Sequence, residues 1–266
     1  MAKLKALLHL PLLALGLLSA PVLHAQKPAT DADQNAAQAQ AILGQMIKAL
    51  GGDAWLNLKN EYREGRSASF YQGKPTGATV EYYEYHSWPT GDRIEFTKHH
   101  DVVQIYKGGQ AWEITYRGLK PLPKDQLDEY LRRKQHSIET VVKLWLKDPR
   151  TILIYEGQHL AARHNSDKVT VISPENDSVT LYLDVQTHLP LKKTYQWRNP
   201  VYKDFDSESE EYDNYRSVDG FPTPFTVTRF KNDDMVNQKF LIRANYNLQL
   251  PADLFDEKAA EKRIKK

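Results

Sequence analysis

The histidines are the first candidates for chemistry, because an imidazole can ligate a metal ion or carry a proton. The densest group is His99, His100 and Asp101. These residues lie on or beside an expected strand, where adjacent side chains point to opposite faces, so the two imidazoles cannot easily share one metal ion. His159 and His164 flank an expected loop and make no better site. We therefore expect no metal centre.

The acidic side chains are concentrated between residues 204 and 213, which read DFDSESEEYD. A calcium loop places its ligands at fixed spacing around a central Gly, and this run lacks that spacing. A solvated hairpin is the simpler expectation.

The common catalytic motifs are missing from the chain. The sequence contains no G-x-S-x-G, no H-E-x-x-H, no phosphate-binding P-loop and no G-x-G-x-x-G. It also has no Cys, which excludes thiol catalysis, Cys-ligated metals and a disulfide framework. An enzyme is the least supported class of protein, and we expect no catalytic residue and no cofactor.

Residues 1–25 are typical of a secretory signal peptide. Lys3 and Lys5 form a positive start, an apolar run covers 6–18, and Ala25 is a small residue at the expected cleavage position. The apolar run is shorter than the roughly 20 residues that cross a bilayer, so we expect no stable membrane anchor. Removing the two lysines from the 36 basic residues leaves 34, which equals the 34 acidic residues. This balance argues against nucleic acid or a polybasic membrane contact as a partner.

Helical patterns occur at two places in the remaining chain. Residues 26–35 are polar and are expected to form a disordered leader. Apolar residues at helical spacing then predict an amphipathic helix over 36–50. A second helical region covers 121–147, and Ser137 could cap a fresh helix inside it.

Strand patterns fill the rest, in segments between 61 and 116 and again between 151 and 246. One face of each strand is expected to be apolar and the other polar. This order of elements predicts one α+β domain over residues 36–256, in which a large antiparallel sheet meets a few helices. A charged, frayed tail is expected over 257–266.

Aromatic side chains are frequent, with 15 Tyr, 5 Trp and 8 Phe, and they favour the strands. Between Glu81 and Pro89 they fall on both faces of one strand, which indicates contacts on both sides of the sheet. Ordinary core packing explains this pattern. A sharper interpretation is that one face lines an apolar cavity beneath the helical stripe of Ile138, Val142 and Trp145.

Five segments together resemble a known family. They are ALGG at 49–52, VVQIYKGGQAWEITY at 102–116, NDSVTLYLDVQTHLPLKK at 176–193, EYDNYRSVDGFPTPFTVTRFKN at 211–232 and LPADLFD at 250–256. The chain resembles the LolA-like periplasmic lipoprotein carrier superfamily, and most strongly its outer-membrane lipoprotein-sorting branch. The resemblance implies an unclosed antiparallel β-barrel of about eleven strands, with helices as a lid over a concave apolar face. It also implies a periplasmic carrier of acylated cargo, a lipoprotein or a lipid, without catalysis or cofactor.

One position departs from the family pattern. The archetypal carrier has an Arg immediately before the Pro that ends a strand and links the sheet to the lid. In this chain Trp88 precedes Pro89. The departure concerns the hand-over of lipoproteins and leaves an apolar pocket in place.

The residues expected to bind the cargo are the apolar strand positions and the apolar stripe of the lid. They are Ile94, Phe96, Trp112, Ile114, Tyr116, Leu181, Leu183, Tyr195 and Trp197 on the sheet, with Ile138, Val142 and Trp145 on the lid. The alternation gives the two faces of each strand but does not say which face is concave. The alternative is an envelope protein–protein interaction module, whose cavity is filled by its own side chains.

Overall fold

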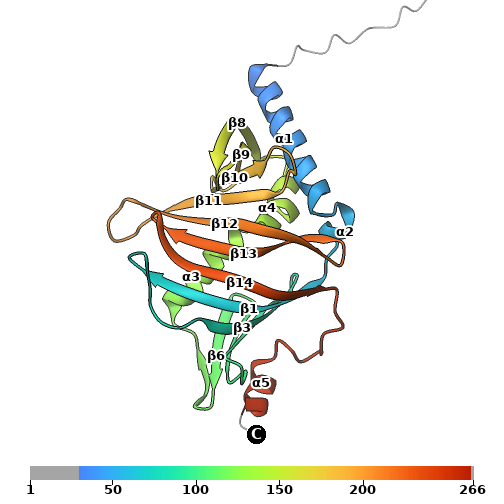
Figure 1. The fold of residues 1–266 in the computed structure, drawn as a ribbon. Coiled ribbons are helices and arrows are strands. Elements are labelled where there is room, and N and C mark those ends of the chain that lie inside the picture. The colour runs from blue at the N-terminus through green and yellow to red at the C-terminus, as the bar shows by residue number, and fades with distance from the viewer. Residues whose placement is uncertain (1–29, 265–266) are drawn as a thin grey trace, which may run out of the picture.

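The computed structural model describes residues 30–264, which form one antiparallel sheet of 14 strands with helices on both of its faces (Figure 1). The helices are α1 (Asp31–Leu50), α2 (Asp53–Leu56), α3 (Lys124–Gln135), α4 (Ile138–Lys143), the short 3-10 helix η1 (Trp145–Lys147) and α5 (Glu257–Ile264). The strands of the first half are β1 (Asn60–Tyr71), β2 (Lys74–Pro75), β3 (Val80–Ser87), β4 (Gly91–Phe96), β5 (Val102–Lys107), β6 (Gln110–Thr115) and β7 (Gly118–Pro121). Those of the second half are β8 (Ile152–Ala161), β9 (His164–Ile172), β10 (Ser178–Asp184), β11 (Pro190–Arg198), β12 (Phe205–Val218), β13 (Phe221–Lys231) and β14 (Asp234–Tyr246).

The sheet is built from two meanders that join in its middle. The first runs outward from β1 to β7, and after the helices the chain re-enters at the opposite edge and returns from β8 to β14. Strand β14 then pairs with β1 along most of its length. Because β7 and β8 remain unpaired edges, the sheet is not closed. The expected α+β class and antiparallel sheet are confirmed, but there are 14 strands instead of about eleven. Two of these strands, β2 and β7, have two and four residues, too few to give an alternating pattern.

Helix α1 begins at Asp31, earlier than the sequence pattern predicts. The side chain of Thr30 accepts a hydrogen bond from the backbone of Asp33, and the Asp33 side chain accepts one from the backbone of Thr30. This reciprocal capping box stabilises the first turn, so residues that were expected to belong to a disordered leader are helical. The expected signal peptide, and residues 26–29 of the leader, lie outside the described residues.

The second helical region divides as expected at Ser137. Its side chain accepts a hydrogen bond from the backbone N–H of Thr140 and so caps α4. Helices α3 and α4 pass behind the strands in Figure 1 and cover the concave face of the sheet. We refer to these two helices as the lid.

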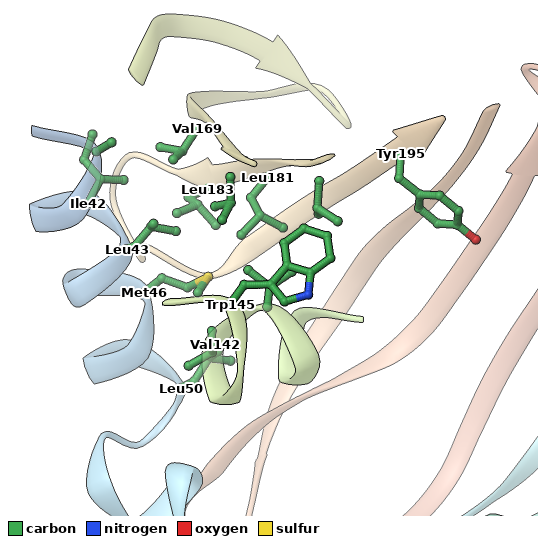
Figure 2. Close-up of a cluster of buried hydrophobic side chains, with 14 residues drawn as sticks. Ile42, Leu43, Met46, Leu50, Val142, Trp145, Val169, Leu181, Leu183 and Tyr195 are labelled. Carbon is green, nitrogen blue, oxygen red and sulfur yellow. The ribbon is translucent and has the colours of Figure 1, made fainter. Parts of the chain in front are cut away.

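The largest core lies between α1, α4 and strands β9 to β11 (Figure 2). Leu43, Met46 and Leu181 are almost fully buried in it. Trp145 lies beside them and also contacts the ring of His136 edge-on. This core covers one part of the concave face, so several of the residues expected to bind cargo pack against the protein's own helices.

The opposite, convex face has a cover of its own. Leu254, Phe255 and Ala260 of the C-terminal segment pack against strands β5 and β6. The tail expected to be frayed is therefore helical as far as Ile264 and contributes to a second core. This segment also buries polar residues of β4 that were expected to lie on a solvent-exposed face of the sheet. Arg93 is 5% exposed and donates hydrogen bonds to Glu95 at 2.6 Å and to the carbonyl of Leu254 at 2.9 Å.

Candidate functional site

A cleft lies between the lid and the middle strands of the concave face. It has two adjoining compartments of about 250 Å³ and 320 Å³, which share lining residues such as Glu61, His86 and Glu139. Each is at or just below the lower end of the roughly 300–1,000 Å³ usual for small-molecule sites. We call the whole space the lid cleft.

The smaller compartment is largely apolar. Its walls include Leu50 at the end of α1, Trp55 of α2, Trp88 after β3, Ile138 of the lid and Phe221 of β13. Pro190, Pro222 and Pro224 add to these walls, and charged side chains shared with the larger compartment form the remaining side: Glu61, Arg63, His86, Glu139, Lys193 and Glu210. We call it the apolar compartment.

The larger compartment is charged, and we call it the charged compartment. Three ion pairs lie on its floor: one within β1, one between the neighbouring strands β11 and β12, and one that joins β14 to β3 across β1. They are Arg63–Glu61 at 3.1 Å, Lys193–Glu210 at 3.1 Å and Lys239–Glu84 at 2.9 Å. Burial opposes the charge of Glu210, but the Lys193 ammonium and the Tyr212 hydroxyl outweigh it and lower the pKa of Glu210 to about 2. The concave face is therefore not the continuous apolar surface that the resemblance implied.

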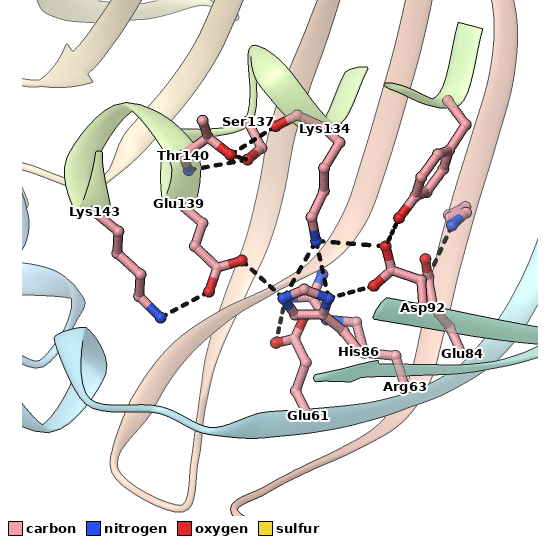
Figure 3. Close-up of polar contacts among 12 residues, drawn as sticks. Glu61, Arg63, Glu84, His86, Asp92, Lys134, Ser137, Glu139, Thr140 and Lys143 are labelled. Atoms are coloured by element: carbon pink, nitrogen blue, oxygen red, sulfur yellow. Dashed lines mark hydrogen bonds and ion pairs between the residues drawn. The ribbon is translucent and has the colours of Figure 1, made fainter. Parts of the chain in front are cut away.

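A cluster of polar contacts joins the lid to the sheet at the boundary of the two compartments (Figure 3). His86 of β3 contacts Asp92 of β4 through Nδ1 and Glu139 of α4 through Nε2, the latter at 2.8 Å. Tyr130 of α3 donates a hydrogen bond to Asp92, and Lys134 lies 3.4 Å from the same carboxylate. We call these five residues the lid latch.

Three members of the lid latch, His86, Asp92 and Glu139, are charged at neutral pH. Burial favours neutral His86, but its hydrogen bonds to Asp92 and Glu139 outweigh burial and raise the pKa of His86 to about 10. Burial likewise favours the neutral carboxyl groups, but the hydrogen bond from His86 holds the pKa of Asp92 and of Glu139 at about 2. A protonated imidazole thus lies between two carboxylates, each on a different element.

Trp88 occupies the position where the family pattern has an Arg. Two lid lysines lie near its ring, with Lys134 Nζ 5.6 Å and Lys143 Nζ 5.4 Å from the ring centre. These are cation–π distances. The positive charge at this point comes from the lid, while the sheet contributes an aromatic surface.

The structure distributes the twelve expected cargo residues over several sites. Ile138 lines the apolar compartment, and Ile94 lines the charged one. The other residues that share the face of the lid are buried in the first core or packed against it: Val142, Trp145, Leu181, Leu183, Tyr195 and Trp197. Phe96 pairs with Tyr82 and Val102 in the sheet and belongs to none of the cores.

Three of the twelve lie elsewhere. Ile114 and Trp112 belong to the second core, which lies on the convex face beneath the C-terminal segment and is called the convex-face core below. Tyr116 is 72% exposed. The reason is that successive side chains of a strand point to opposite faces of the sheet. Trp112 faces Ile105, which in turn faces Arg93, so all three point to the convex side, whereas Ile94 points to the concave side.

The charged lining of the cleft was not found from the sequence. The acidic run at 204–213 was expected to be a solvated hairpin, but most of it lies in strand β12. There Glu208 is 3% exposed, and Glu210 and Tyr212 follow on the same face, where the latter two line the cleft. Charged residues at alternate positions of one strand were the sequence signal from which this charged lining could have been predicted. It was missed because a polar residue at every second position reads as a solvent-facing surface.

The His86 imidazole is held by its neighbours on both sides. Each ring nitrogen of His86 is engaged by a carboxylate, so neither is free to accept a proton from a substrate. Within residues 30–264, no three His, Asp or Glu side chains are grouped so as to hold a metal ion. Over the same residues, no helix has both the length and the apolar character needed to span a bilayer.

The open antiparallel sheet with a helical lid defines a class of fold that solved structures share. A DUF1329 family protein from Desulfovibrio piger superposes with a TM-score of 0.60 at 11% identity, covering 85% of this chain and 99% of the other. A putative outer membrane lipoprotein-sorting protein domain from Vibrio parahaemolyticus gives 0.56 at 10% identity, covering 85% and 100%. A LolA superfamily protein from Nitrosomonas europaea gives 0.51 at 12% identity, covering 83% and 98%.

These likenesses confirm the resemblance at the level of the fold, which is that of the LolA-like superfamily. No protein-family model matches the sequence, and no curated protein matches it.

Proposed function

We propose that this chain is an exported, periplasmic, non-catalytic carrier or binder of acylated cargo, a lipoprotein or a lipid. The observation that supports it is the amphipathic character of the lid cleft, in which an apolar compartment adjoins a charged one. Burying an acyl chain contributes about 0.8 kcal/mol per methylene. Cargo of this kind needs a polar place for its head group and an apolar place for its chain.

The size of the cleft bears on how such cargo enters. An apolar compartment of about 250 Å³ holds only part of a long acyl chain. The lid is fastened to the sheet by the lid latch, and α3 and α4 are short helices of 12 and 6 residues. Cargo entry therefore involves movement of the lid away from the strands, with the latch contacts exchanged for contacts to the cargo.

The test is mass spectrometry of organic extracts from the mature protein, purified from a periplasmic fraction without detergent. Ile138→Asp introduces a charge into the apolar compartment at the first residue of α4, where an acidic residue is tolerated by the helix. Ile152→Asp is the matched control, because Ile152 lies on the outer face of β8 and is 56% exposed.

We expect an acyl species in extracts of the wild type and of Ile152→Asp, and its loss from Ile138→Asp. An empty wild-type extract, together with no fluorescence enhancement of an apolar probe by the native protein, would contradict the proposal.

The alternative is an interaction module that docks an envelope protein. The loop between β11 and β12 favours it, because Val201 and Tyr202 are 74% and 80% exposed at its tip. Replacing both by Ser removes this apolar tip. Loss of a crosslinked partner in periplasmic extracts of that variant, with probe binding unchanged, would support docking over carriage.

A further inference from the structure

We infer that the charged compartment selects cargo with an anionic head group, a carboxylate or a phosphate, which lies against Lys134 while the attached chain passes Trp88 into the apolar compartment. This inference rests on the proposed function and narrows it to one class of amphiphile. Three features of the lid cleft carry it: the balance of charge, the surplus of hydrogen-bond donors and the position of Trp88.

The balance of charge in the charged compartment is positive. Its lining has seven cationic side chains, Arg63, His86, Arg133, Lys134, Lys193, Arg229 and Lys239, against five carboxylates, Glu61, Glu84, Asp92, Glu139 and Glu210. Glu129 and Glu208 lie beside this set and offset the charges of Arg133 and Arg229, which leaves the excess of positive charge at the lid latch. An anion entering the compartment is therefore attracted by its lining.

At the lid latch, the lysine without a close carboxylate partner is Lys134. Lys143 is buried and donates to Glu139 at 2.8 Å and to the carbonyl of Leu58 at 3.4 Å, so it has partners of its own. Lys134 has three N–H donors and a single carboxylate, Asp92, at 3.4 Å. Its nearest neighbour is Nδ1 of His86 at 3.0 Å, and a protonated imidazole offers no lone pair to accept a hydrogen bond.

Two arginines of the same compartment also have an unused donor. Nε of Arg63 and Nε of Arg229 are inaccessible and have no hydrogen-bond partner. Within residues 30–264, the buried carboxylate oxygen that lacks a partner belongs to Glu208, which does not line the lid cleft. Because both arginine nitrogens are inaccessible, a ligand cannot reach them as the side chains stand, and the donors available to it are those of Lys134. A ligand that fits this compartment brings acceptor oxygens, as carboxylates and phosphates do.

The position of Trp88 connects this anion site to the apolar compartment. Its ring lines the apolar compartment and lies 5.6 Å from Lys134 Nζ. Ile138, the first residue of α4 and four residues after Lys134, lines the same compartment. A head group at Lys134 therefore places the first methylenes of its chain on Trp88 and directs the chain toward Ile138.

The test compares three ligands with the same alkyl chain: dodecanoate, dodecyl phosphate and dodecanol. Their affinities for the mature full-length protein are measured by displacement of a fluorescent apolar probe at low and high salt. A hydrogen bond to a charged group is worth about 1.5–3 kcal/mol, so we expect the anions to bind at least about tenfold more tightly than the alcohol. High salt should weaken the binding of the anions and not that of dodecanol.

Variants of helix α3 test whether the preference for anions depends on Lys134. Lys134→Gln should remove most of the preference for the anions over dodecanol, measured as the ratio of affinities so that any effect of the latch on all three ligands cancels, and Lys134→Arg should restore the preference. Lys124→Gln is the matched control, because Lys124 is on the same helix, exposed, and paired with Asp128. It should behave as the wild type.

The outcomes separate the inference from the proposed function. Equal affinity for the three ligands would overturn the inference and leave the carrier function standing. Binding of none of them would overturn both. Tighter binding of dodecyl phosphate than of dodecanoate would assign the site to phosphorylated lipids, and the reverse order would assign it to free fatty acids; either order above dodecanol supports the inference.

Discussion

Replacing His86 by Gln tests whether the lid latch holds the lid on the sheet. His86 makes two charge-assisted hydrogen bonds, to Asp92 on the neighbouring strand and to Glu139 on α4. Each such bond contributes about 1.5–3 kcal/mol. The variant does not leave the carboxylates without a cation, because Asp92 keeps Lys134 and Glu139 keeps Lys143. We therefore expect the free energy of unfolding at neutral pH to fall by about 2–4 kcal/mol, less than the sum of two bonds.

The assay is urea denaturation of the mature protein, followed by circular dichroism. His100→Gln is the control variant, because the His100 side chain is 44% exposed and has one carboxylate contact, to Glu95 at 2.6 Å. Because the His100 imidazole is half-exposed and the buried Glu95 keeps its ion pair with Arg93, we expect this substitution to cost no more than about 1 kcal/mol. If His86→Gln loses no more stability than His100→Gln, the latch does not hold the lid, and the reasoning is refuted.

The same variant changes the dependence of stability on pH. The pKa of His86 is raised from 6.5 to about 10, so the native protein holds this proton more tightly than the unfolded chain does. Its stabilising effect is complete below pH 6.5 and is lost as the pH rises through about 10. The pKa values of Asp92 and Glu139 are lowered from 3.8 and 4.5 to about 2, so their effect is present above pH 4.5 and is lost as the pH falls through about 2. Between about pH 7 and about pH 10 the wild type should lose stability more steeply than His86→Gln, and parallel curves would contradict the assignment.

Three further substitutions test the packing. Leu181→Ala removes a fully buried side chain from the first core and should lower the free energy of unfolding by about 2–5 kcal/mol in urea; a loss below about 1 kcal/mol would mean that this core is loosely packed. Trp112→Ala removes a ring from the convex-face core, so it should lower the unfolding midpoint while probe affinity stays within about twofold of the wild type; loss of probe binding in the folded variant would place Trp112 in the site. Gly65→Ala places a Cβ 2.2 Å from the carbonyl oxygen of Phe240 at a bulge between β1 and β14, and should destabilise the protein by about 1–3 kcal/mol or more; a melting temperature equal to that of the wild type would contradict that geometry.

Much of the fold could be predicted from local patterns. The strands from β8 to β14 lie within the region 151–246 where strand patterns are expected, and the division of the lid at Ser137 follows from a capping residue placed inside a helical stripe. These features depend on residues a few positions apart, whose spacing is printed in the sequence. The helical start at Asp31 and the helical tail from Glu257 were missed, because capping by Thr30 and burial of Ala260 outweigh the polar composition of those segments.

The character of the cleft could not be predicted in this way. Alternation assigned Ile94 and Trp112 to apolar strand faces, but only the course of the C-terminal segment decides that the face of Trp112 is covered on the convex side. The cleft instead gathers side chains from strands and lid segments far apart in the chain, as in the contacts of His86 with Glu139 and of Lys239 with Glu84. Each of these charges is locally indistinguishable from a solvated surface residue. The sequence by itself determined which side chains share a strand face, because that is set by the pleat. Tertiary structure decided which face is enclosed, because enclosure depends on pairing β14 with β1 and on where the lid and the C-terminal segment pack.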